Sequence, residues 1–119
     1  MKKANETTYS EAYLDYVCER EKLMPVVTEQ GLALLAEWPN EKLVYLRDVY
    51  VKPAYRKQGF GRQFVELACY HAEAIDYTGV IVSISPSAVG SHDSLQAAFN
   101  CGFKLKSASE NAIWLVKEI

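Results

Sequence analysis

A basic, glycine-containing loop between a strand and a helix is the sequence feature that most constrains this fold. The strand is predicted over residues 43–51, which are rich in valine, tyrosine and leucine. Pro53 ends the strand, and Gly59 and Gly61 let the backbone turn tightly and approach a ligand closely. The helix that follows offers unpaired N–H groups and the positive end of its dipole. This arrangement favours a site for an anionic phosphate group.

Hydrophobic periodicity along the rest of the chain predicts a mixed α+β domain with the order α-β-β-β-α-β-α-β-β. The predicted helices cover residues 8–23, 62–75 and 91–100. The predicted strands cover residues 26–28, 32–38, 43–51, 79–85, 103–107 and 112–119. Residues 32–36 could equally form a helix, although Pro39 limits its length. Tyr9, Tyr13 and Tyr16 follow helical spacing, and we expect them to be packing residues; the alternatives are that they line an acceptor cleft or a dimer contact.

Composition narrows the class of protein. The length of 119 residues fits one domain, residues 1–119. A net charge of −2 and a pI of about 5.7 argue against a general nucleic-acid binder. We expect a cytoplasmic protein, because no apolar run reaches the length of a membrane span and no signal peptide is recognisable. The three cysteines include no CxxC pair, so we predict neither a disulfide framework nor a metal site.

Three phosphate-binding motifs compete for the loop. A Walker P-loop is excluded because the chain contains no GxxxxGK[ST] segment. A dinucleotide fingerprint needs a third glycine where Phe64 stands, and an acidic residue after the next strand, which ends in residues 83–86. Neither requirement is met. The third alternative is a coenzyme A site.

Residues 51–61 read V-K-P-A-Y-R-K-Q-G-F-G and carry a family resemblance. They match, in register, the V-x-P-x-x-R-x-x-G-x-G/A motif of the GNAT superfamily of N-acetyltransferases. The Gly-Phe pair at residues 102–103 also resembles a signature of that family. The resemblance covers about residues 26–119 and implies a small member of the superfamily, shortened at its N-terminus. It implies a central mixed, mostly antiparallel sheet with splayed central strands, flanked by helices.

The resemblance also implies a function and a cofactor site. The implied reaction moves an acetyl group from acetyl-CoA directly to an amine. The end of strand 43–51 would pair with the pantetheine amides while strand 79–85 splays away, and residues 56–61 would meet the pyrophosphate through main-chain N–H groups. The implied cofactor-binding residues are Val49, Tyr50, Val51, Arg56, Lys57, Gln58, Gly59, Phe60, Gly61 and Arg62.

The resemblance identifies the catalytic residues less clearly than the cofactor-binding residues. The family often places a tyrosine near the end of its last helix, where it can protonate the leaving thiolate, and this chain has Ala98 there. Ser85, His92 or a water are candidates for that role. Asp48 is the only carboxylate on strand 43–51 and is the candidate general base; the alternative is an ion-paired strand aspartate.

The N-terminal segment, which in the family helps to shape the acceptor site, is short in this chain. About 25 residues precede the strand at residues 26–28, which leaves room for a single helix. The acceptor side is then either open or completed by a second subunit in a homodimer. The amine acceptor could be a protein lysine, an N-terminus or a small molecule. The alternative function is a non-catalytic GNAT-fold protein that serves as a binding or structural module.

Overall fold

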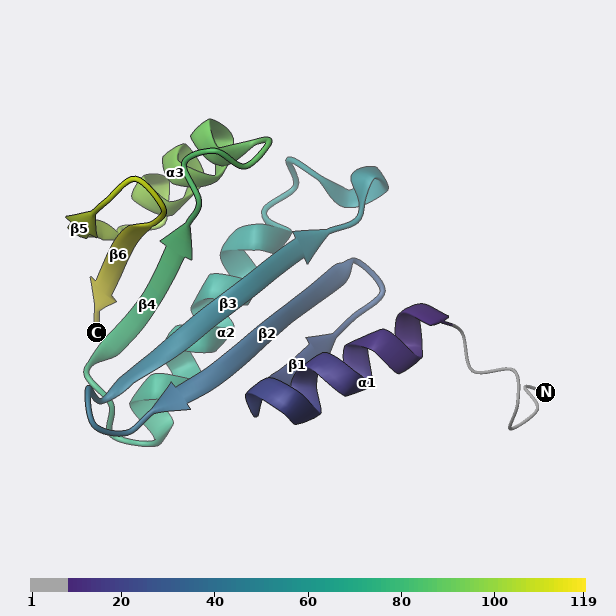
Figure 1. Ribbon diagram of the computed structural model, residues 1–119, viewed down its shortest axis with the longest axis horizontal. Helices are drawn as coiled ribbons and strands as arrows, with labels where there is room; N and C mark the ends of the chain where they lie inside the picture. The colour runs from purple at the N-terminus through teal and green to yellow at the C-terminus, as the bar shows by residue number, and fades with distance from the viewer. Residues whose placement is uncertain (1–8) are drawn as a thin grey trace.

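The computed structural model describes residues 9–119, and within them the predicted order of elements is confirmed (Figure 1). The helices are α1 (Tyr9–Glu21), α2 (Phe60–Ala74) and α3 (Ser91–Asn100), with one 3-10 turn, η2 (Pro53–Tyr55). The strands are β1 (Met24–Val27), β2 (Gly31–Trp38), β3 (Leu43–Val51), β4 (Gly79–Ile84), β5 (Lys104–Ala108) and β6 (Ile113–Glu118). Residues 31–38 form a strand, which excludes the helical alternative for that segment.

All the described strands belong to one sheet with the order β1-β2-β3-β4-β6-β5. The central pair, β3 and β4, is parallel, and the other neighbouring pairs are antiparallel. The prediction of a mixed, mostly antiparallel sheet is therefore confirmed. The parallel pair is possible because α2 forms the crossover connection between β3 and β4.

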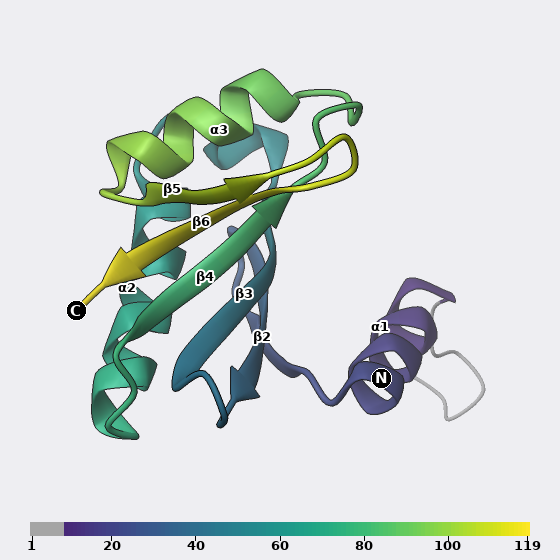
Figure 2. The ribbon, with the colours of Figure 1, turned by 60° about the vertical axis from the view of Figure 1, so that its left-hand side comes forward.

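Helices α1 and α2 lie on opposite sides of the sheet (Figure 2), and a hydrophobic cluster lies under each of them. Ala68 and Ala72 of α2 are fully buried against one face, in a cluster that includes Val44, Val80 and Leu115. On the other face, Val17 of α1 packs in a smaller cluster with residues of β2. The small alanine side chains let α2 approach the sheet closely, and the main core lies between them. This packing also fixes the position of the loop that precedes α2.

Helix α1 contacts the sheet through one stripe of its surface. Leu14, Val17 and Cys18 face the smaller cluster, whereas Tyr13 and Tyr16 are 57% and 53% exposed. The prediction that these two tyrosines are packing residues is wrong, because they lie on the side of α1 that faces away from the sheet. The side chain of Tyr9 lies outside the described residues.

Ion pairing fixes the end of α1 over the sheet. The guanidinium of Arg47 on β3 donates to both carboxylate oxygens of Glu21, at 2.8 and 3.0 Å. Glu21 is the last residue of α1, so the pair ties this helix to the centre of the sheet. Within residues 9–119, no helix is both long and apolar enough to cross a bilayer.

Candidate active site

The central strands part after a short paired segment. β3 and β4 pair at three positions, from Leu43 opposite Gly79 to Tyr45 opposite Ile81. β3 then continues to Val51 along β2, while β4 continues to Ile84 along β6. Among the described residues, the β3 backbone groups that point toward β4 beyond Tyr45 therefore have no strand partner. An unpaired strand edge offers its N–H and C=O groups to another extended chain, so this edge can accept an extended ligand.

A groove of about 490 Å³ fills the opening between the parted strands. β3 and the start of α2 form one wall, and β4 with α3 forms the other. The α3 wall consists of small side chains that recur at helical spacing: Ser91, Ser94, Ala97, Ala98 and Cys101. Small residues on this wall leave the groove wide enough for a ligand chain.

A β-bulge interrupts β3 beside the groove. Leu34 of β2 pairs with Asp48 and Leu35 pairs with Leu46, which leaves Arg47 as an extra residue. Leu34 faces α1, so its partner Asp48 lies on the α1 face together with Arg47. Arg47 donates to Asp48 as well as to Glu21, and the Asp48 side chain stays 47% exposed. Burial alone would lower the pKa of Arg47, but its bonds to the two carboxylates outweigh that and raise the pKa.

The start of α2 presents backbone donors at the end of the groove. Gly59 precedes the helix in the left-handed region, with φ of 89°, a conformation that favours glycine. The N–H of Gln63 donates to the carbonyl of Gly59 at 3.1 Å as the first helical bond, so the N–H groups of residues 60–62 precede the ladder. A Cβ atom added at Gly61 would meet nothing within 4 Å, and Gly61 lines the groove. Packing within the protein therefore does not require glycine there.

Side chains of the basic loop mostly fold back onto the protein. Arg56 donates to the carbonyl of Val51 at 2.9 Å, and its guanidinium lies 5.7 Å from the ring centre of Tyr50. Gln58 donates to the carbonyl of Ala54 at 3.1 Å. Lys57 is exposed in the left-handed region, with φ of 61°. These contacts hold the loop in shape and engage the Arg56 and Gln58 side chains within the protein.

The structure divides the predicted cofactor residues into two groups. Val49, Gly61 and Arg62 line the groove, whereas the remaining members of the predicted set do not. Arg62 also donates to the carbonyl of Asn100 at 3.0 Å, which joins the start of α2 to the end of α3 across the groove. The ring of Phe60 turns away from the groove and packs edge-on to Tyr55, 5.8 Å between ring centres. Phe60 can therefore serve a ligand only through its N–H.

The structure brings the two predicted catalytic residues to one groove. Asp48 comes from β3, and Ser85 follows β4 on the facing wall, with its hydroxyl 3.4 Å from that of Ser87. Ala98 lines the same groove at the position where the family often has a tyrosine. Sequence reasoning missed Ser83, which lines the groove and lies 3.1 Å from the Tyr45 hydroxyl. Only the pairing of the strands reveals this contact, because the two residues are 38 positions apart.

Thiols and metal ligands complete the description of the site. Cys101 lines the groove, and Cys69 lies behind it on α2, where burial is the largest of the causes that raise the pKa of its thiol. Across the part of the chain that the structure describes, no three His, Cys, Asp or Glu side chains are grouped to hold a metal ion.

Comparison with protein families assigns most of the chain. A family model described as "Acetyltransferase (GNAT) family" matches residues 4–103. No sequence among the curated proteins gives a significant match.

Solved structures share the fold at low sequence identity. A Bacillus subtilis acetyltransferase in complex with CoA is 16% identical, with a TM-score of 0.72, and the match covers 96% of this chain and 95% of that one. The PaiA N-acetyltransferase of Thermoplasma acidophilum in complex with coenzyme A is 12% identical, with a TM-score of 0.70 over 92% and 70% of the two chains. Nourseothricin acetyltransferase is 18% identical, with a TM-score of 0.64, over 75% of this chain and 57% of that one. The match thus covers little more than half of Nourseothricin acetyltransferase.

Proposed function

Since this chain belongs to the GNAT family of acetyltransferases, we propose that it transfers the acetyl group of acetyl-CoA to a primary amine. The observation that carries the proposal is the groove where β3 and β4 part, next to the glycine-opened start of α2. This groove combines an unpaired strand edge with unpaired helical N–H groups. A long ligand with amide groups and a diphosphate needs both.

The chain's own residues would hold the donor at three points. The free edge of β3 over residues 46–51 would pair with the pantetheine amides. The N–H groups of residues 60–62 and the dipole of α2 would hold the pyrophosphate. Arg62 and Lys57 are the exposed cations closest in sequence to these N–H groups and would add positive charge. Acetyl-CoA itself supplies an activated acetyl group as a thioester.

Positioning and backbone donors would supply much of the rate enhancement. Direct transfer needs the amine nitrogen to meet the thioester carbonyl in one fixed geometry. Beyond the bulge at Arg47, β3 lines the groove and is no longer paired with β4, and backbone N–H groups there would stabilise the oxyanion of the tetrahedral intermediate. No covalent enzyme intermediate is required, so Cys101 has no assigned role.

Asp48 would receive the acceptor as an ammonium ion and assist its deprotonation. At pH 7, a lysine-like amine with a pKa of about 10.4 costs about 4–5 kcal/mol to deprotonate, and an α-amine costs about 1 kcal/mol. Asp48 is partly exposed on the α1 face of the sheet and is held in place by Arg47. Ser85 on the opposite wall would donate a hydrogen bond to the leaving thiolate, which would take its proton from water.

Replacement of Asp48 tests this proposal. We expect Asp48→Asn to lower kcat/KM for amine acetylation by about a hundredfold or more, as measured by thiol release from acetyl-CoA, without changing CoA affinity. Asp76→Asn, beyond the far end of α2, is the matched control and should leave both quantities unchanged. An Asp48→Asn enzyme with parental kcat/KM would remove the carboxylate from the mechanism.

Alanine at position 98, where the family often has a tyrosine, favours a non-catalytic binding module as the alternative function. A groove that lacks the tyrosine could bind CoA and a partner without catalysis, as a binding module. The two functions differ in one readout, since the module would bind CoA in calorimetry but release no thiol with any amine.

A further inference from the structure

We propose that the open face of the sheet beside the groove holds the apolar, aromatic body of the acceptor amine. This inference rests on the proposed function and names its substrate class. It rests on three side chains, here called the aromatic platform, which come from three strands: Trp38 of β2, Tyr45 of β3 and Trp114 of β6.

The rings of the platform contact one another across the sheet. Ring centres of Trp38 and Tyr45 are 4.8 Å apart, and Trp114 lies 5.9 Å from each of them. Trp114 pairs with Ser83 of β4, whose small side chain lets the rings meet over that strand. All three rings are partly exposed. A grouped, partly exposed set of large aromatic rings is typical of a binding surface.

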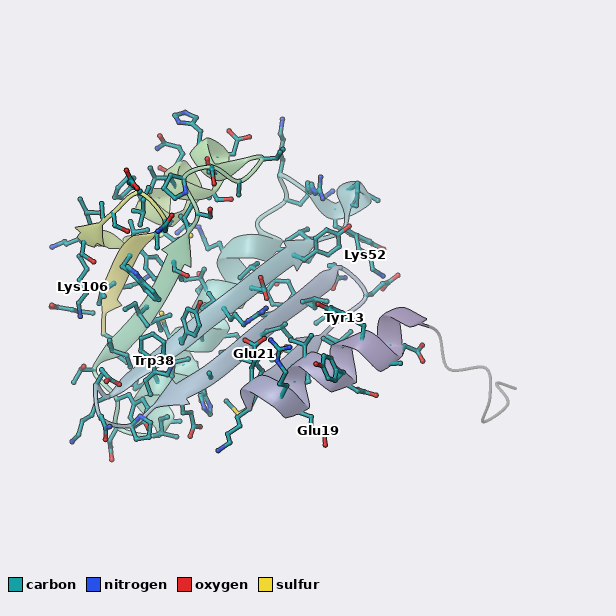
Figure 3. The ribbon with its side chains drawn as sticks, viewed as in Figure 1. Tyr13, Glu19, Glu21, Trp38, Lys52 and Lys106 are labelled. Atoms are coloured by element: carbon teal, nitrogen blue, oxygen red, sulfur yellow. The ribbon has the colours of Figure 1, made fainter. Side chains whose placement is uncertain are left out.

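The face that carries the platform is the one on which α1 lies. Figures 1 and 2 show α1 beside β1 and β2, while none of the helices in residues 9–119 covers β3, β4 and β6 on that side. Figure 3 shows Trp38 and Glu21 on this side of the sheet. The main core lies on the opposite face, under α2. Trp38 and Tyr45 pack against the edge of the smaller cluster under α1, whereas Trp114 belongs to neither cluster.

The platform is continuous with the mouth of the groove. Ser83 lines the groove and hydrogen-bonds to the hydroxyl of Tyr45, 3.1 Å away. The bulge places Asp48 on the same face as Tyr45, two to three strand residues further along β3, which corresponds to about 7–10 Å. An acceptor that lies on the rings can therefore reach Asp48 with an alkyl arm.

Charged side chains near the groove mouth, beyond Tyr45 on the platform, favour a cationic ligand. Glu21 and Asp48 flank the single guanidinium of Arg47, so the cluster carries two negative charges and one positive charge. A net negative cluster at the groove mouth attracts an ammonium group, and aromatic faces accept apolar and cationic groups. The combination favours a primary amine on an arylalkyl body over an acceptor that is anionic or polar throughout. The 7–10 Å reach favours phenylbutylamine over benzylamine.

Intrinsic fluorescence gives a direct readout of the platform. Both tryptophans of the chain belong to it, so their emission reports on this surface alone. With CoA saturating, we expect phenylbutylamine to change the emission saturably and n-butylamine to leave it unchanged. We also expect kcat/KM for acetylation of phenylbutylamine to exceed that of n-butylamine by about tenfold.

Substitution separates the platform from the rest of the site. Trp114→Leu should reduce the ratio of kcat/KM for phenylbutylamine to kcat/KM for n-butylamine to about twofold or less. If that variant does not fold, Trp38→Leu tests the same point, because we expect the same reduction. The matched control is Tyr70→Leu, since Tyr70 is an aromatic residue on α2 that is 77% exposed. It should leave the ratio unchanged. CoA calorimetry on each variant shows that the donor site is intact.

The outcomes are distinct. Absence of CoA binding and of acetylation with every amine would refute the proposed function. Acetylation of n-butylamine with no advantage for phenylbutylamine, or a ratio unaltered in both tryptophan variants, would overturn the platform alone. Emission that changes with protein concentration but not with amine would also overturn it and would assign the surface to contacts between copies of the chain.

Discussion

Replacement of Gly61 separates the two reasons for which a glycine can stand in the first turn of a helix. A Cβ at this position meets no atom within 4 Å, and the residue lies in α2 without a positive φ. Gly61→Ala should therefore stabilise the ligand-free protein by about 0.5–1 kcal/mol, because alanine loses less backbone entropy on folding. For a domain of this size, that is a rise in Tm of about 2–5 °C.

Gly61→Glu tests the ligand at the same position. A carboxylate in the first turn is compatible with the helix dipole, so the ligand-free protein should keep a Tm close to that of the parent. Like charges about 4 Å apart near a protein surface repel by about 4 kcal/mol, which corresponds to about a thousandfold loss in CoA affinity. The measurements are a thermal melt without ligand and a CoA titration by calorimetry.

Two results would refute the reasoning about Gly61. Parental CoA affinity in Gly61→Glu would show that the start of α2 is not the diphosphate site. A Tm several degrees below that of the parent in Gly61→Ala would show that the glycine is needed for folding, and the inference from its open surroundings would fail.

Further predictions concern stability. Leu115 is 0% exposed, so Leu115→Ala should cost about 2–5 kcal/mol and lower the urea midpoint without changing the m-value; a cost below about 1 kcal/mol would contradict the assignment of Leu115 to the core. Glu21→Gln should weaken the attachment of α1 to β3 by about 1 kcal/mol or less, because both side chains are about one-third exposed, and should speed hydrogen exchange in α1 but not in α2. Burial raises the pKa of Cys69 in the folded state. Above about pH 8.5 the unfolded chain therefore binds fewer protons at this thiol than the folded chain, and stability should fall as the pH rises. In melts from pH 7 to 9.5, Cys69→Ala should show a shallower decline, and a parallel decline would exclude Cys69 as its source.

The secondary structure could be predicted because its signals are local. The apolar run of residues 43–51, the helical spacing after Gly61 and the turns near proline and glycine each depend on neighbours in sequence. The segment 32–36 needed tertiary information, since an apolar run of that length fits either a helix or a strand, and pairing of β2 with β1 and β3 decides between them.

The details of the site depend on register, which the sequence does not display. The bulge at Arg47 moves Asp48 to the α1 face, and no residue type in β3 marks that shift. Trp38 and Trp114 are 76 positions apart, so they meet only because β2 and β6 lie in one sheet. Tyr13 and Tyr16 were expected to pack because helical spacing identifies a stripe but not which stripe has a partner.

Mapping of acetyl-CoA by amide chemical shifts tests the central claim most directly. A titration of the ¹⁵N-labelled protein reports on each backbone N–H, including those that would hold the donor. We predict saturable shifts concentrated at residues 46–51 of β3 and at residues 59–62, with little change in β1 and α1. Binding with its largest shifts elsewhere, or no binding at all, would contradict the assignment of the groove between β3 and β4 as the acetyl-CoA site.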